Sequence, residues 1–336
     1  MTDTSAQSDQ PVIAEGVEEE PVEANRRLFE GWRFTLMATL AAAYAAFHMA
    51  ALNGLSISEW TGVTIPFLPT FPLETWNFRI VHVAGALFMG FLLFSAHLKF
   101  ADEETKETPL WTYAGYALLI PALIACFSAL NFASRISAGE MWNGLAPEFR
   151  NPEIYWFGIP LLLATFGGIL LGWLHKSPRG RYSVPDIVLG VCGTAVAIYL
   201  ITIFGTLMRN STGTPFAPIG ISLAAVAGTA LIMELTRRVA GLALIIIAGL
   251  FLVYVFTGHL MPGFLNSPQI DWARFFSQVY TDAGILGPTT AVSSTYIILF
   301  IIFAAFLQAS KVGDYFVNFA FAAAGRSRGG PAKVAI

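Results

Sequence analysis

The feature that most constrains this chain is a series of eight apolar runs, each about as long as the roughly 20 helical residues that cross a bilayer core. Only 12% of the residues are charged, whereas soluble domains carry about 25%. Because lipid cannot satisfy exposed backbone groups, such runs must form helices. We therefore expect an all-α polytopic membrane protein with about eight transmembrane helices plus short interfacial helices. The expected spans are residues 34–52, 80–98, 111–132, 154–174, 187–207, 216–235, 239–257 and 291–307.

A charged motif separates the sixth and seventh apolar runs, where Glu234 is followed by the adjacent arginines Arg237 and Arg238. Two adjacent arginines are costly in lipid, so we interpret them as an aqueous turn between two spans. On a continuous helix Glu234 lies three and four residues from the arginines, which allows ion pairs. The favoured interpretation is a cytoplasmic turn that joins the two helices. The alternative is a direct role of Glu234 in ion movement.

The distribution of lysine and arginine predicts the orientation in the membrane. If the spans alternate from a cytoplasmic N-terminus, the inner segments hold fourteen basic residues and the outer segments hold five. Cytoplasmic loops are enriched in Lys and Arg, so both termini should be cytoplasmic. The fourteen are Arg26, Arg27, Arg33, Lys99, Lys106, Lys176, Arg179, Arg181, Arg237, Arg238, Lys311, Arg326, Arg328 and Lys333, and the five are Arg79, Arg135, Arg150, Arg209 and Arg274.

The segments outside the apolar runs divide into a tail, loops and short amphipathic stretches. Residues 1–25 are acidic and lack aromatic side chains, which predicts a disordered cytoplasmic tail. This tail carries the acidity of the chain, so we expect no nucleic-acid partner. Residues 53–78, 133–153 and 258–288 are expected as periplasmic loops. Residues 271–280 and 312–325 are expected as helices lying at the membrane interface.

No enzyme motif is present, so we expect neither catalytic residues nor a cofactor. His48 and His82 fall inside the first two spans, where an ionisable side chain is a functional candidate. Helix packing through a neutral histidine is the favoured interpretation, and proton or ligand handling is the alternative. Cys126 and Cys192 also fall inside spans, where free thiols pack as small apolar groups. We therefore predict no metal site.

A cluster of hydroxyl side chains opens the last apolar run, directly after the helix-breaking sequence Gly287–Pro288. Hydroxyls at membrane depth can satisfy backbone groups that a broken helix leaves free, or they can line a polar path. The first interpretation is favoured and the second stays open. The candidate residues for a substrate or ion path are Thr289, Thr290, Ser293, Ser294 and Thr295.

Several of these motifs together resemble a known family. Residues 231–241 read LIMELTRRVAG, which is similar to the Glu-x-Thr-Arg-Arg-x-x-Gly join of fused TRAP transporter permeases (tripartite ATP-independent periplasmic transporters) of the TAXI-type branch. Residues 293–307 (SSTYIILFIIFAAFL), 313–316 (GDYF) and 324–334 (AGRSRGGPAKV) resemble the opening of that family's large membrane domain. The similarity is strongest over residues 216–336.

The resemblance implies a domain division and a function. Residues 26–235 would form the small membrane domain and residues 236–336 the start of the large transport domain. The family imports an organic anion, commonly a carboxylate, on a sodium or proton gradient, which implies a place in the bacterial inner membrane. Its expected partner is a TAXI-type periplasmic substrate-binding protein, besides the lipid bilayer.

The chain also departs from the family pattern in two ways. It has six spans before the arginine pair instead of four, so residues 111–174 are expected as an extra hairpin. It stops at Ile336, where the family continues into a Ser/Gly-rich hairpin, so we expect a truncated permease whose remainder would be a further partner. A non-transporting membrane scaffold or assembly subunit is the alternative function.

Overall fold

The structure, a computed structural model, describes residues 25–54, 75–101 and 109–324. Within these ranges the chain is helical and forms no strand beyond two isolated bridges. Eight helices are long and apolar enough to cross a membrane, which confirms the predicted all-α polytopic class. These spans are Gly31–Asn53, Thr75–Leu93, Leu110–Ser137, Pro147–Leu174, Val184–Phe204, Ile219–Ala240, Leu242–Leu260 and Pro288–Ala309.

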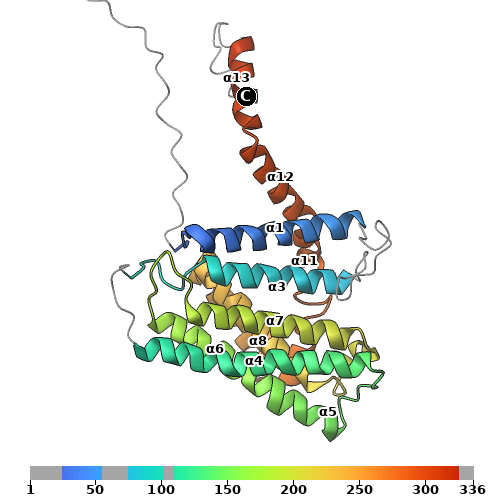
Figure 1. Cartoon of the computed structure of the whole chain (residues 1–336). Coiled ribbons are helices and arrows are strands. Elements are labelled where there is room, and N and C mark those ends of the chain that lie inside the picture. Colours follow the sequence, from blue (N-terminus) through green and yellow to red (C-terminus); the bar gives the residue numbers. More distant parts are fainter. Residues whose placement is uncertain (1–24, 55–74, 102–108, 325–336) are drawn as a thin grey trace, which may run out of the picture.

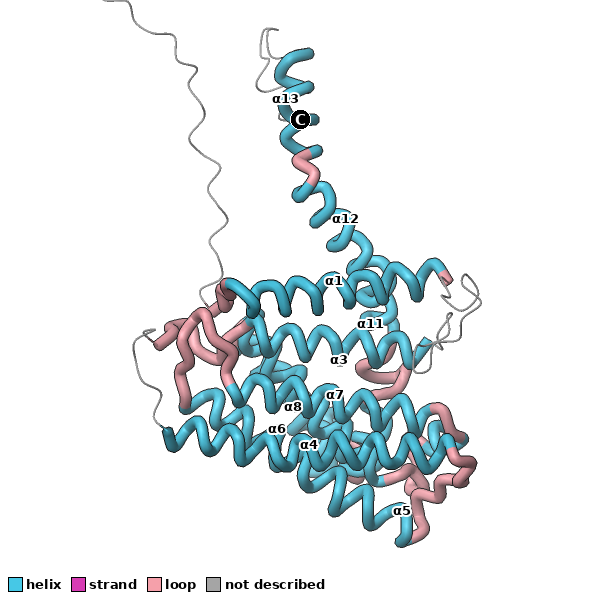
Figure 2. Tube along the Cα trace, in the orientation of Figure 1, coloured by secondary structure: helices cyan, strands magenta, loops and turns pink. Residues whose placement is uncertain are grey.

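Helix α7 (Val184–Phe204) forms the centre of a bundle whose other members surround it. It contacts α3 (Thr75–Leu93), α4 (Pro109–Ser137), α6 (Ile159–Leu174) and α8 (Ile219–Ala240), and these helices run roughly parallel to one another (Figures 1 and 2). The facing surfaces are built from small residues, which let helix backbones approach closely in lipid. Examples that are fully buried are Ala122, Ala125, Ala129, Ala164, Ala195, Ala224 and Ala227.

The predicted extra hairpin is part of this core. Its second arm begins as α5 (Pro147–Pro152), continues through a π-helical segment (Glu153–Gly158) and ends as α6. The polar loop predicted over residues 133–153 is therefore shorter than expected, because α4 continues to Ser137 and the next helix starts at Pro147. This change places Glu153 inside a helix instead of a loop.

The second span differs from its prediction at both ends. It was expected over residues 80–98, whereas α3 covers Thr75–Leu93. The helix stops early because the segment that precedes α1 (Gly31–Asn53) pairs with its end. Arg27 N–H donates to Leu93 O (2.8 Å), and Ser95 N–H donates to Asn25 O (2.9 Å). Residues 94–98 are thereby released to line the end of the bundle.

The last third of the chain is more loosely attached to the bundle. Helix α10 (Trp272–Val279), predicted from its amphipathic pattern, packs on α8 and is capped by Asp271, whose carboxylate accepts from Ala273 N (3.0 Å). Helix α9 (Leu242–Thr257) buries none of its residues. Helices α12 (Ile298–Ala309) and α13 (Val312–Ala324) form an arm that leads away from the bundle (Figure 1). The expected interfacial position of α13 stays a prediction.

Candidate functional site

The predicted hydroxyl cluster lies where α11 (Pro288–Val292) passes into a π-helical segment (Ser293–Ile297). Its members divide into two groups. Ser294 and Thr295 donate to the carbonyl of Ala291 (3.1 and 2.7 Å), and Thr290 donates to the carbonyl of Ile285. These three hydroxyls donate to backbone carbonyls in and just before α11. Ser293 instead points across to another helix.

Ser293 reaches a pair of histidines that the sequence analysis treated separately. His48 on α1 and His82 on α3 lie within hydrogen-bond distance (Nε2 to Nδ1, 2.9 Å), and His82 Nε2 lies 3.1 Å from Ser293 Oγ. The Tyr44 hydroxyl donates to the backbone carbonyl of His82 (2.8 Å), and its oxygen also lies 2.9 Å from His82 Nδ1. Four side chains from three segments therefore form one hydrogen-bonded chain.

One backbone carbonyl sets the direction of the hydrogen bonds among Tyr44, His48, His82 and Ser293. His48 Nδ1 lies 2.8 Å from the carbonyl of Tyr44, which can only accept, so Nδ1 carries a proton. If both rings are neutral, His48 Nε2 accepts from His82 Nδ1–H, and His82 Nε2 accepts from the Ser293 hydroxyl. All ring nitrogens are then satisfied without a charge. The lone pairs of Ser293 Oγ remain free to accept from a ligand.

A cavity of about 600 Å³ adjoins the hydrogen-bonded side chains of His82 and Ser293. It lies between α3, α8 and the residues around the start of α11. Five of its lining side chains are polar, namely His82, Thr236, Thr289, Thr290 and Ser293, and the remainder are mostly apolar. The structure thus brings three of the five predicted path residues to one cavity, and it turns Ser294 and Thr295 to the helix backbone.

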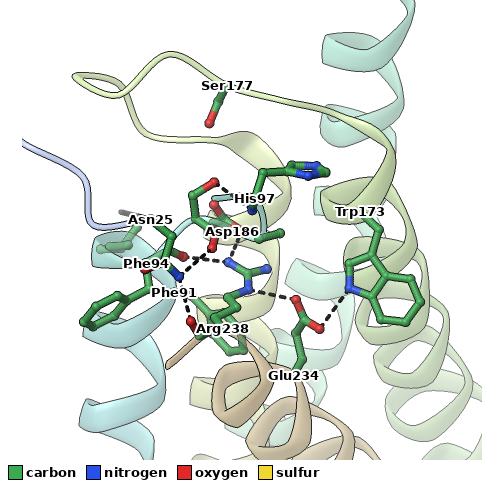
Figure 3. A network of polar contacts seen from close by, with 12 residues as sticks. Asn25, Phe91, Phe94, His97, Trp173, Ser177, Asp186, Glu234 and Arg238 are labelled. Carbon is green, nitrogen blue, oxygen red and sulfur yellow. Dashed lines mark hydrogen bonds and ion pairs between the residues drawn. The ribbon is translucent and has the colours of Figure 1, made fainter. Parts of the chain in front are cut away.

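The arginine motif forms a second polar centre at the end of α8, shown in Figure 3. Arg237 donates to both oxygens of Glu234 (2.8 and 2.9 Å), and Arg238 Nε donates to Oε1 (2.8 Å). The predicted pairing within the motif is confirmed. Trp173 Nε1 adds a further bond to Glu234 Oε2 (2.9 Å).

The turn between the sixth and seventh spans lies just after this motif, but Glu234 and Arg238, which were expected at an aqueous turn, are buried. Helix α8 continues through both arginines to Ala240, and the chain turns at Gly241, whose φ of 83° is one that glycine adopts readily. Glu234 and Arg238 are only 3% and 5% exposed. They can be buried because other elements of the bundle supply partners for their charges.

The chief partner is Asp186, in the first turn of α7. Its Oδ1 accepts from Arg238 Nη1 (2.7 Å) and its Oδ2 accepts from Arg27 Nη2 (2.6 Å). Arg238 Nη1 also donates to the carbonyl of Phe94 (2.9 Å), and Asn25 donates to the carbonyl of Arg238 (2.6 Å). The network therefore ties α3, α7, α8 and the segment before α1 together. The sequence analysis placed Asp186 just outside the fifth span and did not identify it.

Glu153 is another buried carboxylate that the sequence analysis missed. It is 0% exposed and accepts from Tyr199 Oη (2.6 Å), Trp142 Nε1 (2.7 Å) and the backbone N–H of Gly220 (3.2 Å). All three donors are neutral. No local pattern marks Glu153, because its donors lie in other parts of the sequence.

Cys126 and Cys192 are free thiols. Among the described residues no group of three or more His, Cys, Asp or Glu side chains could hold a metal ion.

The fold and these sites define a class, a multi-pass α-helical membrane protein with polar centres inside its bundle. Residues 227–336 match the family model described as tripartite ATP-independent periplasmic transporter, DctM component. This match includes the arginine motif, α9 to α13 and the hydroxyl cluster, and it supports a TRAP transporter permease. No curated protein and no solved structure matches the chain.

Proposed function

We propose that this chain is the membrane permease component of a TRAP transporter that imports an organic anion, of the carboxylate class, on an ion gradient. The observation that carries the proposal is the match of residues 227–336 to the DctM component family. Sodium is the proposed coupling ion and the proton is the alternative. The partner that such a permease needs is a periplasmic substrate-binding protein, here of the TAXI type.

The cavity beside Ser293 is the proposed substrate or ion path. It lies between α3, which is outside the matched residues, and elements that belong to them. Its Thr289, Thr290 and Ser293 side chains supply oxygen atoms next to an apolar wall. Secondary transporters use broken helices of this kind to coordinate ions and substrates at membrane depth.

Uptake by whole cells tests this function. A strain that lacks the gene is complemented with the native chain, and uptake of a panel of radiolabelled carboxylates is measured with and without sodium. We expect the uptake of one or more carboxylates to be lost when the gene is deleted and to be restored by the native chain. A protonophore that abolishes sodium-independent uptake would identify the proton as the coupling ion.

The matched variants are Ser293→Ala and Ser310→Ala. Ser310 is the residue that ends α12 at its C-terminus. Its hydroxyl donates to Leu307 O and lies away from the cavity. We expect Ser293→Ala to reduce uptake and Ser310→Ala to leave it unchanged. Undiminished uptake of every carboxylate in the deletion strain, with loss of another membrane complex, would instead support the scaffold function.

The proposed orientation places the Arg237–Arg238 end of the bundle in the cytoplasm. Arg179 lies in the connection between α6 and α7, at the end where Asp186 binds Arg238, and Leu145 lies in the connection between α4 and α5 at the opposite end. A membrane-impermeant maleimide should label Leu145→Cys in intact cells and should label Arg179→Cys only after lysis. Strong labelling of Arg179→Cys in intact cells would reverse the orientation.

A further inference from the structure

A second cavity, of about 510 Å³, lies beside the arginine network. It is bounded by residues 96–98 after α3, by the last turn of α8 and by the start of α9. It is separate from the cavity at Ser293, with which it shares only Val239. It lies at the helix ends, where the apolar spans α8 and α9 meet.

Two buried nitrogen atoms next to this cavity have no hydrogen-bond partner. They are Arg238 Nη2 and His97 Nε2, and both residues line the cavity. Figure 3 shows His97 and Arg238 at the same end of the bundle. Gly172 leaves room next to the guanidinium, since a Cβ there would lie 3.4 Å from Nη2. An unsatisfied buried donor such as Arg238 Nη2 is costly, and His97 Nε2 becomes a second donor when the ring is protonated, so the two atoms together favour a ligand that accepts hydrogen bonds.

The charges around the cavity favour an anion. Three arginines (Arg27, Arg237 and Arg238) meet two carboxylates, and every carboxylate oxygen of Asp186 and Glu234 already accepts from an arginine. The network therefore has an excess positive charge, and none of its four carboxylate oxygens lacks an arginine partner. This charge disfavours a cation.

His97 adds a proton-dependent element. Its pKa is lowered by burial and by the positive charges of Lys176, Arg237 and Arg238, while the backbone of Gly172 partly offsets this by bonding the ring. A bound anion would counter these charges and raise the pKa of His97. Binding would then take up a proton, so the affinity would rise as the pH falls.

The mouth of the cavity is apolar. Leu98 and Leu242 are 72% and 61% exposed, and Val239 in the last turn of α8 has half of its surface exposed. A ligand that fits both the positively charged interior and the apolar mouth has an anionic head and apolar chains. Basic pockets between transmembrane helices bind the head groups of anionic lipids in this way.

We propose that this cavity binds a phosphate-type oxyanion through Arg238 Nη2 and a protonated His97 Nε2, and its apolar rim favours the phosphodiester of an anionic membrane lipid as the source. The bound anion would complete the charge balance of the arginine network. This proposal is independent of what the protein transports.

Calorimetric titration of the purified full chain in detergent micelles tests the proposal. The probes are dioctanoylphosphatidylglycerol, inorganic phosphate and the zwitterionic dioctanoylphosphatidylcholine, each at pH 6 and pH 8. We expect the phosphatidylglycerol to bind about 3–10-fold more tightly at pH 6, with proton uptake, and the zwitterionic lipid to bind weakly. Equal affinity for inorganic phosphate would identify a free anion as the source. Failure of both anionic probes to bind at millimolar concentration would overturn the proposal.

Variants separate this site from unspecific lipid binding. His97→Phe should remove the pH dependence and weaken binding, whereas His259→Phe should change neither. His259 is a suitable control because its Nδ1 is also buried without a partner, but it lies beyond the far end of α9. Ala96→Leu, which fills the cavity without changing a charge, should weaken binding at both pH values. Unchanged binding in both His97→Phe and Ala96→Leu would contradict the site.

Discussion

Asp186 and Glu153 are both buried carboxylates, but they lie at opposite ends of the bundle and have opposite kinds of partner. Asp186 is 2% exposed and contacts two arginines, Arg27 and Arg238. Glu153 is 0% exposed and accepts from three neutral donors, Trp142, Tyr199 and Gly220. The same functional group is therefore buried by charge pairing at one end and by hydrogen bonds at the other.

The difference predicts what each carboxylate contributes. Without its negative charge, Asp186 would leave two buried cations uncompensated, and an uncompensated buried charge is strongly destabilising. Without its charge, Glu153 would leave only neutral dipoles, which a neutral amide can partly satisfy. We therefore expect the stability of the folded protein to depend on the negative charge of Asp186 but mainly on the acceptor oxygens of Glu153.

The largest effect is expected for Asp186→Asn. It preserves the shape of the side chain but removes the charge shared by Arg27 and Arg238, so the free energy of unfolding should fall by about 3–5 kcal/mol. Reversible unfolding of the purified chain in mixed detergent micelles measures this change. A loss below about 1 kcal/mol would show that the arginines find other compensation.

A smaller effect is expected for Glu153→Gln. The amide oxygen can still accept from Trp142 and Tyr199, while the amide nitrogen faces the N–H of Gly220, so the loss should be about 1–2 kcal/mol. The same unfolding measurement applies. If Glu153→Gln destabilises the protein as much as Asp186→Asn, the contrast between the two ends is incorrect.

The smallest effect is expected for Asp282→Asn. Asp282 pairs with Arg79 at 3.3 Å, but its side chain is largely exposed. Exposed ion pairs contribute about 0–1 kcal/mol, so this variant should unfold almost as the native chain does. It serves as the control for charge removal as such, and a larger loss would show that the assay responds to net charge.

The comparison also separates what the sequence could predict from what it could not. All eight spans and the pairing of Glu234 with both arginines follow from local patterns, because hydropathy and helical spacing are properties of short segments. The burial of Arg238 was not predicted because Asp186, which compensates it, lies 52 residues earlier in the chain. Burial of a charge depends on such distant partners.

The candidate cavity shows the same limit. The hydroxyl residues were predicted from their density after Gly287–Pro288, and His48 and His82 from their place inside apolar runs. Their meeting at Ser293, which is 211 residues from His82, depends on how α3 packs against the start of α11. Glu153 carried no local signal at all, because a carboxylate beside Pro152 reads as part of a loop.

The central claim is that Asp186 and Arg238 form a buried pair that fixes the end of the bundle. A double-mutant cycle with Asp186→Asn and Arg238→Gln, measured by unfolding in mixed micelles, tests it most directly. We predict a coupling free energy in the upper part of the range of about 0.5–3 kcal/mol seen for contacting residues. The corresponding cycle for Asp282 and Arg79 should give about 0–1 kcal/mol. Additive effects of Asp186→Asn and Arg238→Gln would contradict the account.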